Sequence, residues 1–301
     1  MVESFKARKM ILIAGGDGQL GKALNAAARS MLYSSHALGR KELDITDKSS
    51  VNDVVKDLKP DIVINCAAWT NVDAAEKYPD KALEINAYGA RNLAEASKNV
   101  NARFFQLSTD YVFSGEKKEP WDEYDTKSPI SSYGLSKSLG EDFVLDSYPE
   151  NSYIIRTAWL YSLGGNNFLT KMLEKIEKNE GNLKIVSDQY GQPTSVTDLA
   201  ERIITMLYLE LNSKIFHATN TGQASWYEFA SIIYKLRGQS SPHIFPIQSS
   251  EFASPAKRPA YSVLGQSAWA NSNLMPMRNW QEALTELLTI KSNKGGATDE
   301  N

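Results

Sequence analysis

Tyr133 and Lys137 stand four residues apart in the sequence. On a helix this spacing places both side chains on one face. An ammonium beside a phenol favours the phenolate, so we expect Lys137 to lower the pKa of Tyr133 from an ordinary value near ~10. A tyrosine tuned in this way can pass a proton to a carbonyl oxygen while a nicotinamide supplies hydride. The same spacing also arises by chance as a solvated surface pair, so the prediction depends on the rest of the chain.

A glycine-rich turn precedes this pair and predicts a nucleotide site. Gly15, Gly18 and Gly21 form GxxGxxG between the apolar run Met10–Ala14, typical of a buried strand, and a helix. Glycine there allows a sharp turn, a close approach of pyrophosphate to the amides and tight packing of helix on strand. Three spaced glycines alone could also be a plain tight loop. Their place between strand and helix favours a dinucleotide turn.

Gly39-Arg40-Lys41 indicates which dinucleotide is bound. It lies about twenty residues beyond the glycines, where an acidic side chain would hold the ribose of NAD. Arg40 could instead pair with the 2′-phosphate of NADP, although a solvated loop arginine is the alternative. Asp44 is close enough in sequence to reach the adenosine. We therefore expect NADPH as cofactor, with NADH as the second choice.

Ser108, Thr109 and Asp110 directly follow the predicted strand 103–107. Their side chains should emerge at the carboxyl edge of the sheet, where such folds bind ligands. A hydroxyl there can donate to a substrate carbonyl and stabilise the developing oxyanion beside Tyr133. A Ser–Thr pair that caps a turn is the alternative. We favour Thr109 as the third catalytic residue.

The order of elements predicts an α/β protein with a Rossmann-type, doubly wound parallel sheet and a smaller C-terminal substrate-binding part. We expect a dinucleotide-binding domain over 1–160, with 195–220 returning to it. The substrate-binding part should cover mainly 161–290 and a disordered tail 291–301. Further strands are expected near 36–38, 62–65, 183–186 and 214–217, helices over 49–58, 81–99, 168–180, 195–210, 225–236 and 280–290, and loops over a site in the Pro- and Ser-rich stretch 242–259.

Composition excludes several other classes. The chain has 301 residues and a net charge of −3, which argues against a general nucleic-acid or membrane-surface binder. Cys66 is the only cysteine, so no intramolecular disulfide can form, and we find neither a signal peptide nor a transmembrane run. A cytoplasmic location is the expectation. The histidines have no cluster of cysteines or carboxylates at ligand spacing, so no metal site is predicted.

With these motifs the chain from Lys9 to about Leu288 resembles the dTDP-4-dehydrorhamnose reductases, a branch of the extended short-chain dehydrogenase/reductases. The resemblance runs through Gly15–Gly21, Leu43–Asp47, Asn65–Thr70, Ser108–Phe113, Tyr133–Lys137, Arg156–Trp159, Asp188–Thr194 and Ala256–Pro259. It implies NADPH-dependent reduction of the C4 ketone of a dTDP-4-keto-6-deoxy-L-hexose, with a dTDP-sugar as the binding partner. Family members often carry an acidic residue where Gly39 stands, and Ala158 replaces a more usual serine.

The resemblance also implies residue roles. Tyr133 would donate the proton, Lys137 would hold the nicotinamide ribose, and Thr109 would polarise the carbonyl. The cofactor-binding residues expected from pattern and resemblance together are Gly15, Gly18, Gln19, Leu20, Gly21, Arg40, Asp44, Ile45, Ala67 and Ala68. The expected substrate-binding residues are Ser108, Asp110, Trp159, Gln192 and Arg258, and Lys257-Arg258 is a candidate clamp for a diphosphate, with a solvated charged turn as the alternative.

Two rival functions remain open at this stage. A nucleotide-sugar epimerase or dehydratase could use the same scaffold, although a dehydratase needs a further acid where Tyr111 follows Thr109-Asp110. A non-catalytic subunit such as the regulatory subunit of methionine adenosyltransferase resembles the same branch. Some members of the branch use Mg²⁺ at a dimer contact, so a homodimer is a candidate assembly, but no ligand set in this sequence identifies the ion.

Overall fold

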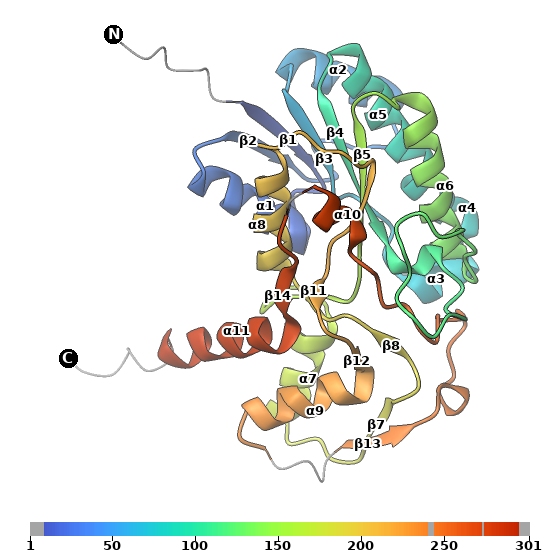
Figure 1. Ribbon diagram of the computed structural model, residues 1–301, viewed down its shortest axis with the longest axis vertical. Coiled ribbons are helices and arrows are strands. Elements are labelled where there is room, and N and C mark those ends of the chain that lie inside the picture. The colour runs from blue at the N-terminus through green and yellow to red at the C-terminus, as the bar shows by residue number, and fades with distance from the viewer. Residues whose placement is uncertain (1–8, 240–243, 273, 295–301) are drawn as a thin grey trace, which may run out of the picture.

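A parallel sheet forms the centre of the computed structural model, which describes residues 9–239, 244–272 and 274–294 (Figure 1). Its six strands lie in the order β10-β5-β4-β3-β1-β2, and every neighbouring pair is parallel. The strands are β1 (Met10–Ala14), β2 (Ser34–Leu38), β3 (Ile62–Asn65), β4 (Arg103–Thr109), β5 (Ser152–Thr157) and β10 (Ile215–His217). The predicted Rossmann-type α/β class is confirmed.

Helices cover both faces of the sheet. Successive side chains of a strand point to opposite faces. Ile11 and Ile13 of β1 therefore pack with α1 (Gln19–Ser30) and α8 (Val196–Met206), whereas Leu12 and Ala14 pack with α2 (Lys48–Leu58), α5 (Ala90–Asn99) and α6 (Ser132–Ser147). These strand residues are fully buried, so both faces contribute to the core.

The strand order determines where a ligand can bind. From β1 the chain passes to β2 on one side and then to β3 on the other, so the order reverses between β1 and β3. The carboxyl ends of strands at such a switch point leave a crevice that open α/β sheets use for ligands. The glycine turn follows β1, and the Ser108–Asp110 run ends β4 at the same edge.

The helix expected over 81–99 is interrupted. It consists of α4 (Pro79–Leu83), a π-helical turn η1 (Glu84–Gly89) and α5. The π-turn brings Asn86 against α6, where its Nδ2 donates to Ser136 Oγ at 2.9 Å and to the carbonyl of Trp69 at 3.1 Å. A Cβ on Gly140 of α6 would collide with the carbonyl oxygen of Asn86, so glycine permits this close packing.

Most of the remaining elements build a smaller layer beyond the carboxyl edge of the sheet, at the bottom of Figure 1. Its core combines Leu169 and Leu173 of α7, Phe229 and Ile233 of α9, and Leu284 of α11. The elements of this layer are β6 (Leu160–Tyr161), α7 (Phe168–Glu177), β7 (Leu183–Val186), β8 (Tyr190–Gly191), β9 (Thr194–Ser195), β11 (Asn220–Thr221), β12 (Ala224–Ser225), α9 (Trp226–Leu236), β13 (Ile244–Ile247), η4 (Ser249–Glu251), β14 (Met277–Asn279) and α11 (Trp280–Lys294). Three short helices lie with the sheet instead: α3 (Val72–Lys77) and η2 (Asp110–Val112) contact α6, and α10 (Ser267–Asn271) contacts β10.

Two expectations for this layer differ from the structure. Part of the stretch expected as loops forms β13, which pairs in parallel with β7 from Ile244–Leu183 to Ile247–Val186. The last helix continues to Lys294, so 291–294 are helical and not part of a disordered tail. Residues 242–243 and 295–301, which also fall in these two predictions, lie outside the described residues.

Candidate active site

The expected catalytic residues meet at one cavity of about 620 Å³ at the carboxyl edge of the sheet. Thr109 comes from the end of β4 and Tyr133 and Lys137 from the first turns of α6, and all three line it. The expected ligand-binding residues that line the same cavity are Gly18, Gln19, Leu20, Gly21, Ala68, Ser108, Asp110 and Trp159. The fold thus brings segments more than a hundred residues apart in sequence to one place.

The glycine turn is shaped by backbone contacts. Gly15 has φ of 81°, and a Cβ there would lie 2.6 Å from the amide nitrogen of Ala67. A Cβ on Gly21 would collide with the carbonyl oxygen of Gly15. Helix α1 then begins at Gln19, with Gly18 as its N-cap. The first amides of α1 therefore face the cavity without a bulky side chain, as pyrophosphate binding at a helix N-terminus requires.

A second cavity of about 250 Å³ adjoins the first, because Asp17, Gly18, Cys66 and Ala68 line both. Five of the expected cofactor-binding residues line it in addition to Gly18 and Ala68: Gly15, Arg40, Asp44, Ile45 and Ala67. The Arg40 side chain is 73% exposed and lies 3.4 Å from the Asp44 carboxylate. Together the two cavities have the extent of a dinucleotide groove that runs from the end of β2 to Tyr133.

Tyr133 and Lys137 occupy the start of α6, which Ser131 caps by accepting from the amide of Gly134 at 3.1 Å. Lys137 is 4% exposed, and its Nζ donates to the carbonyl of Leu107 at 2.5 Å. Burial lowers the pKa of Lys137 to about 8, against the opposing charge of Glu141 one turn away. A buried ammonium and a strand carbonyl are thus joined directly beneath the cavity.

The expected effect of Lys137 on Tyr133 is not found in the protein alone. Burial raises the pKa of Tyr133 to about 12, and a hydrogen bond with Thr109 works in the opposite direction. The prediction of a lowered pKa was wrong because it considered charge and spacing only. Desolvation of the phenol, which depends on tertiary packing, raises the pKa more than the hydrogen bond with Thr109 lowers it.

Thr109 and Asp110 form a short hydrogen-bonded unit. Thr109 Oγ1 donates to Asp110 Oδ1 at 2.9 Å and accepts from the amide of Tyr111 at 3.2 Å. Asp110 is 2% exposed, and burial raises the pKa of its carboxyl to about 6. Tyr111 packs edge-on against the ring of Tyr133 at 5.6 Å between centroids. The Thr109 hydroxyl is therefore held next to the phenol that it should assist.

Trp159 forms the opposite wall with a partner that the sequence did not indicate. Its indole stacks on Trp226 of α9 at 3.5 Å between centroids, with 5° between the planes. Trp159 has φ of 46°, a left-handed conformation that is uncommon for a bulky residue. A Cβ on Gly191 would lie 2.5 Å from its ring, so the glycine makes room for the indole. Both indoles line the cavity and present an apolar plate to a ligand.

Comparison with known proteins identifies the family. The family described as RmlD substrate binding domain matches residues 9–292. The chain belongs to this family. A dTDP-4-dehydrorhamnose reductase of Streptomyces griseus is 42% identical over 289 residues, which cover 95% of each chain. The resemblance drawn from the motifs is therefore confirmed.

Solved structures agree with this assignment. A crystal structure of dTDP-4-dehydrorhamnose reductase from Bacillus anthracis in complex with NADP has 39% identity and a TM-score of 0.90, with 94% of this chain and 99% of that chain covered. UDP-glucose 4-epimerase of Thermus thermophilus in complex with NAD covers 96% of this chain and 100% of its own at a TM-score of 0.79. At 20% identity, this second likeness shows the fold alone.

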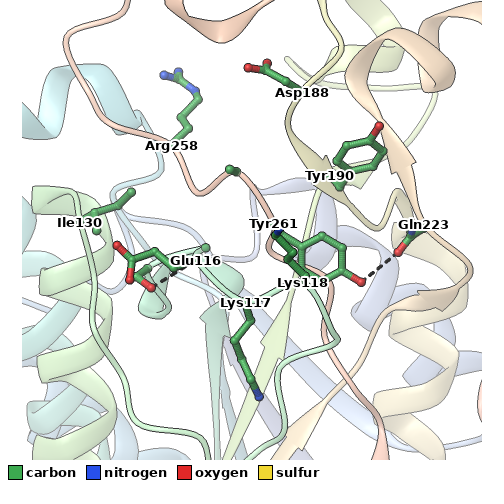
Figure 2. Close-up of a pocket in the computed structure, with 12 residues that line it drawn as sticks. Glu116, Lys117, Lys118, Ile130, Asp188, Tyr190, Gln223, Arg258 and Tyr261 are labelled. Atoms are coloured by element: carbon green, nitrogen blue, oxygen red, sulfur yellow. Dashed lines mark hydrogen bonds between the residues drawn. The ribbon is translucent and has the colours of Figure 1, made fainter.

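In this member of the RmlD family, Arg258 and Gln192 lie apart from the catalytic cavity. Arg258 pairs with Asp73 at 3.1 Å and lines another cavity of about 620 Å³. Figure 2 shows Arg258 and Asp188 at one end of that cavity, with Tyr190 and Tyr261 along its side. Gln192 is 4% exposed and exchanges hydrogen bonds with the backbone of Leu264, at 2.8 and 3.3 Å. It lines none of the three cavities described here.

Sequence reasoning missed the buried network under the site. Ser108 Oγ donates to Glu141 Oε1 at 2.5 Å, so this hydroxyl is engaged away from a substrate. Glu141 in turn binds Arg156 of β5 through two hydrogen bonds of 2.8 and 2.7 Å, and both side chains are 1% exposed. The spacing of Glu141, four residues after Lys137 on one helix face, was the available signal.

The described residues contain no group of three or more His, Cys, Asp or Glu side chains placed to hold a metal ion. In the same part of the chain, no helix is long and apolar enough to span a bilayer. The glycine turn and the two adjoining cavities fit a nucleotide cofactor.

Proposed function

We propose that the chain is an NADPH-dependent oxidoreductase that reduces the C4 ketone of a dTDP-4-keto-6-deoxy-L-hexose, converting dTDP-4-dehydrorhamnose to dTDP-L-rhamnose. One observation carries the proposal. The glycine turn, the Thr109, Tyr133 and Lys137 side chains and the paired indoles of Trp159 and Trp226 all line a single cavity. A hydride donor, a proton donor and a flat wall for a sugar ring can meet there.

Tyr133 is the proton donor in this proposal. NADPH, when bound, supplies the hydride to the carbonyl carbon. Because burial raises its pKa to about 12, Tyr133 retains its proton at neutral pH and can give it to the carbonyl oxygen as negative charge develops. Lys137, with a pKa of about 8, stays mainly protonated at that pH and stabilises the resulting tyrosinate.

Thr109 and Asp110 orient the ketone. Thr109 lies within hydrogen-bond reach of Tyr133 and donates its one hydroxyl proton to Asp110 at 2.9 Å, so it would polarise the carbonyl oxygen by turning that proton from Asp110 to the ketone. Asp110 lines the same cavity and offers an acceptor to the sugar hydroxyls. The stacked indoles of Trp159 and Trp226 would pack against the hexose from the other side.

The dTDP part is proposed to extend toward Arg258. The guanidinium is paired with Asp73 and lies beside Tyr111, which lines the catalytic cavity. A diphosphate could bind the remaining donors of Arg258, and the cavity of about 620 Å³ that this residue lines has room for a nucleoside (Figure 2). This arrangement would leave the hexose next to Tyr133.

The alternative functions make different demands on the residues and the cofactor of the site. A dehydratase needs a second acid near the sugar, whereas Tyr111 follows Asp110 here and burial raises the pKa of its phenol. An epimerase regenerates its cofactor in each cycle and would not consume NADPH. A regulatory subunit of the methionine adenosyltransferase type would bind nucleotide without turnover.

The decisive experiment follows NADPH absorbance with dTDP-4-dehydro-L-rhamnose as substrate. We expect one NADPH to be oxidised for each dTDP-L-rhamnose formed. Conversion of sugar without net NADPH oxidation would favour an epimerase. Capture of a methionine adenosyltransferase, with no NADPH oxidation by any keto sugar, would favour the regulatory subunit.

We also propose a cytoplasmic location. It is supported by the nucleotide chemistry of the site and by Cys66, the only cysteine of the chain, which is partly buried, lines both cofactor cavities and cannot form an intramolecular disulfide. Fractionation of the producing cells tests this proposal.

A further inference from the structure

Asp17 and Gly39 meet at the adenosine end of the cofactor groove. Asp17 belongs to the glycine turn after β1, and Gly39 follows β2, the neighbouring strand. The amides of Gly15 and Gly16 both donate to the carbonyl of Leu38, at 3.0 and 2.8 Å, and hold the turn against the end of β2. A Cβ on Gly39 would fall on Oδ2 of Asp17 and lie 2.6 Å from its carboxyl carbon. The Asp17 carboxylate thus fills the place where a side chain at position 39 would begin.

This place has a known chemical role in dinucleotide turns. An acidic side chain at the end of the second strand accepts hydrogen bonds from the adenosine ribose hydroxyls, and its charge disfavours a 2′-phosphate. Position 39 is glycine here, but the Asp17 carboxylate lies at the point where a side chain of residue 39 would start. Asp17 is exposed to solvent and lines both cavities of the groove.

We propose that Asp17 is a specificity-determining residue for the cofactor, which takes over the role of the missing acidic side chain at position 39. Its carboxylate accepts from the ribose hydroxyls of NADH and opposes the 2′-phosphate of NADPH. Arg40 acts in the other direction. The proposal rests on the proposed reductase function only for its nucleotide cofactor, not for its sugar substrate.

The charged side chains around the adenosine cavity allow Asp17 to disfavour a 2′-phosphate. Arg40 is the basic residue among those that line the adenosine cavity, and it shares that cavity with Asp17 and Asp44. Its guanidinium lies 3.4 Å from Asp44, so part of its charge is already balanced. A phosphate entering here meets two carboxylates and one guanidinium. Removing the charge of Asp17 should therefore strengthen the binding of a 2′-phosphate.

The test compares two nucleotides that differ only in the 2′-phosphate, 2′,5′-ADP and 5′-AMP. Their dissociation constants are measured by calorimetry for the wild type and Asp17→Asn, with Asp53→Asn as a control that removes an exposed carboxylate of α2. We expect Asp17→Asn to tighten 2′,5′-ADP about tenfold at low salt and to weaken 5′-AMP, whose ribose hydroxyls lose the carboxylate acceptor. Asp53→Asn should leave the ratio of the two constants unchanged. Arg40→Ala should weaken 2′,5′-ADP and leave 5′-AMP nearly unaffected.

Steady-state kinetics of Asp17→Asn test the same proposal. The KM for NADPH should fall in Asp17→Asn and the KM for NADH should rise or stay constant. Equal changes for both nucleotides, or weaker binding of 2′,5′-ADP, would show that Asp17 only shapes the turn and would overturn the proposal. Because the binding assay contains no sugar, its failure is distinguishable from failure of the reductase proposal.

Discussion

Ser108 at the end of β4 donates to Glu141 on α6 over 2.5 Å. One turn earlier on the same helix, Lys137 donates to the carbonyl of Leu107, the strand residue before Ser108. These two contacts join the strand that ends in Thr109 to the helix that carries Tyr133. The relative position of hydroxyl and phenol therefore depends on buried polar contacts below the cavity and not on the cavity walls alone.

The stability of this junction can be tested at Arg156. Arg156→Met removes the guanidinium that pairs with Glu141, and the ion-pair partner of this buried carboxylate that then remains among the described residues is Lys127, at 3.4 Å. Removing one partner of a buried pair is strongly destabilising. We expect the free energy of unfolding, measured with urea at pH 7, to fall by about 3 kcal/mol.

A surface pair provides the control for Arg156. Lys175→Met breaks a contact of 2.6 Å with Glu180 between half-exposed side chains, so it should destabilise the fold much less than Arg156→Met does. Although burial opposes it, Arg156 holds the pKa of Glu141 below its ordinary value. The Arg156–Glu141 pair therefore stabilises the fold at pH values above the ordinary carboxyl pKa. This stabilisation is lost as the pH falls through the lowered pKa of Glu141 in the folded protein. Equal losses in both variants would contradict the role given to the buried pair.

Tyr133→Phe tests the proton donor. The substitution removes the phenol oxygen and keeps the ring that packs against Tyr111. We expect kcat to fall about 10²- to 10⁴-fold, the usual contribution of a positioned acid. The dissociation constant of NADPH, measured by fluorescence, should change little. Unchanged turnover would refute the assignment of Tyr133.

A substitution at Gly191 tests the stacked indoles of Trp159 and Trp226 as a binding surface for the sugar. In Gly191→Ala the new methyl group would lie 2.5 Å from the Trp159 ring, and Trp226 stacked at 3.5 Å limits its retreat. We expect the KM for the dTDP-sugar to rise about tenfold, with binding of NADPH retained. Gly164→Ala is the matched control, because a Cβ there has no atom within 4 Å among the described residues. A similar KM in both variants would mean that the stacked indoles of Trp159 and Trp226 do not contact the substrate.

Asp110 should reduce stability at neutral pH. Its carboxyl pKa of about 6, raised by burial from 3.8, means that the protonated form is favoured in the folded protein. The stability that the fold gains from keeping Asp110 protonated is complete below pH 3.8, the ordinary pKa. It is lost as the pH rises through the folded pKa of about 6. Asp110→Asn should therefore increase the free energy of unfolding at pH 7 by about 1–3 kcal/mol and show almost no gain at pH 4.

Urea unfolding at several pH values between 4 and 8 measures this effect. Asp146→Asn, which changes an exposed carboxylate of α6, is the control and should give no gain that depends on pH. A gain for Asp110→Asn that is the same at pH 4 and pH 7 would indicate a packing effect instead of a charge effect. If Asp110 contacts the sugar, the variant should also bind substrate more weakly.

Local patterns in the sequence were enough to predict the frame of the site. The glycine turn, the Tyr133–Lys137 spacing and the apolar runs of β1, β3 and β4 each lie within a few residues, where backbone preference and side-chain periodicity act directly. The right-handed connection of successive parallel strands then places their carboxyl ends at one edge. For these reasons the fold class and the candidate cofactor and catalytic residues could be named in advance.

Tertiary structure alone decided the features that depend on distant partners. Strand β13 pairs with β7 about sixty residues away, and Pro246 within it makes the segment look like a loop. Trp226, Glu141 and Asp17 acquire their contacts only when separate elements pack. The pKa of Tyr133 moved opposite to the expectation because burial, which no local spacing encodes, costs the phenolate more than the neighbouring polar groups return.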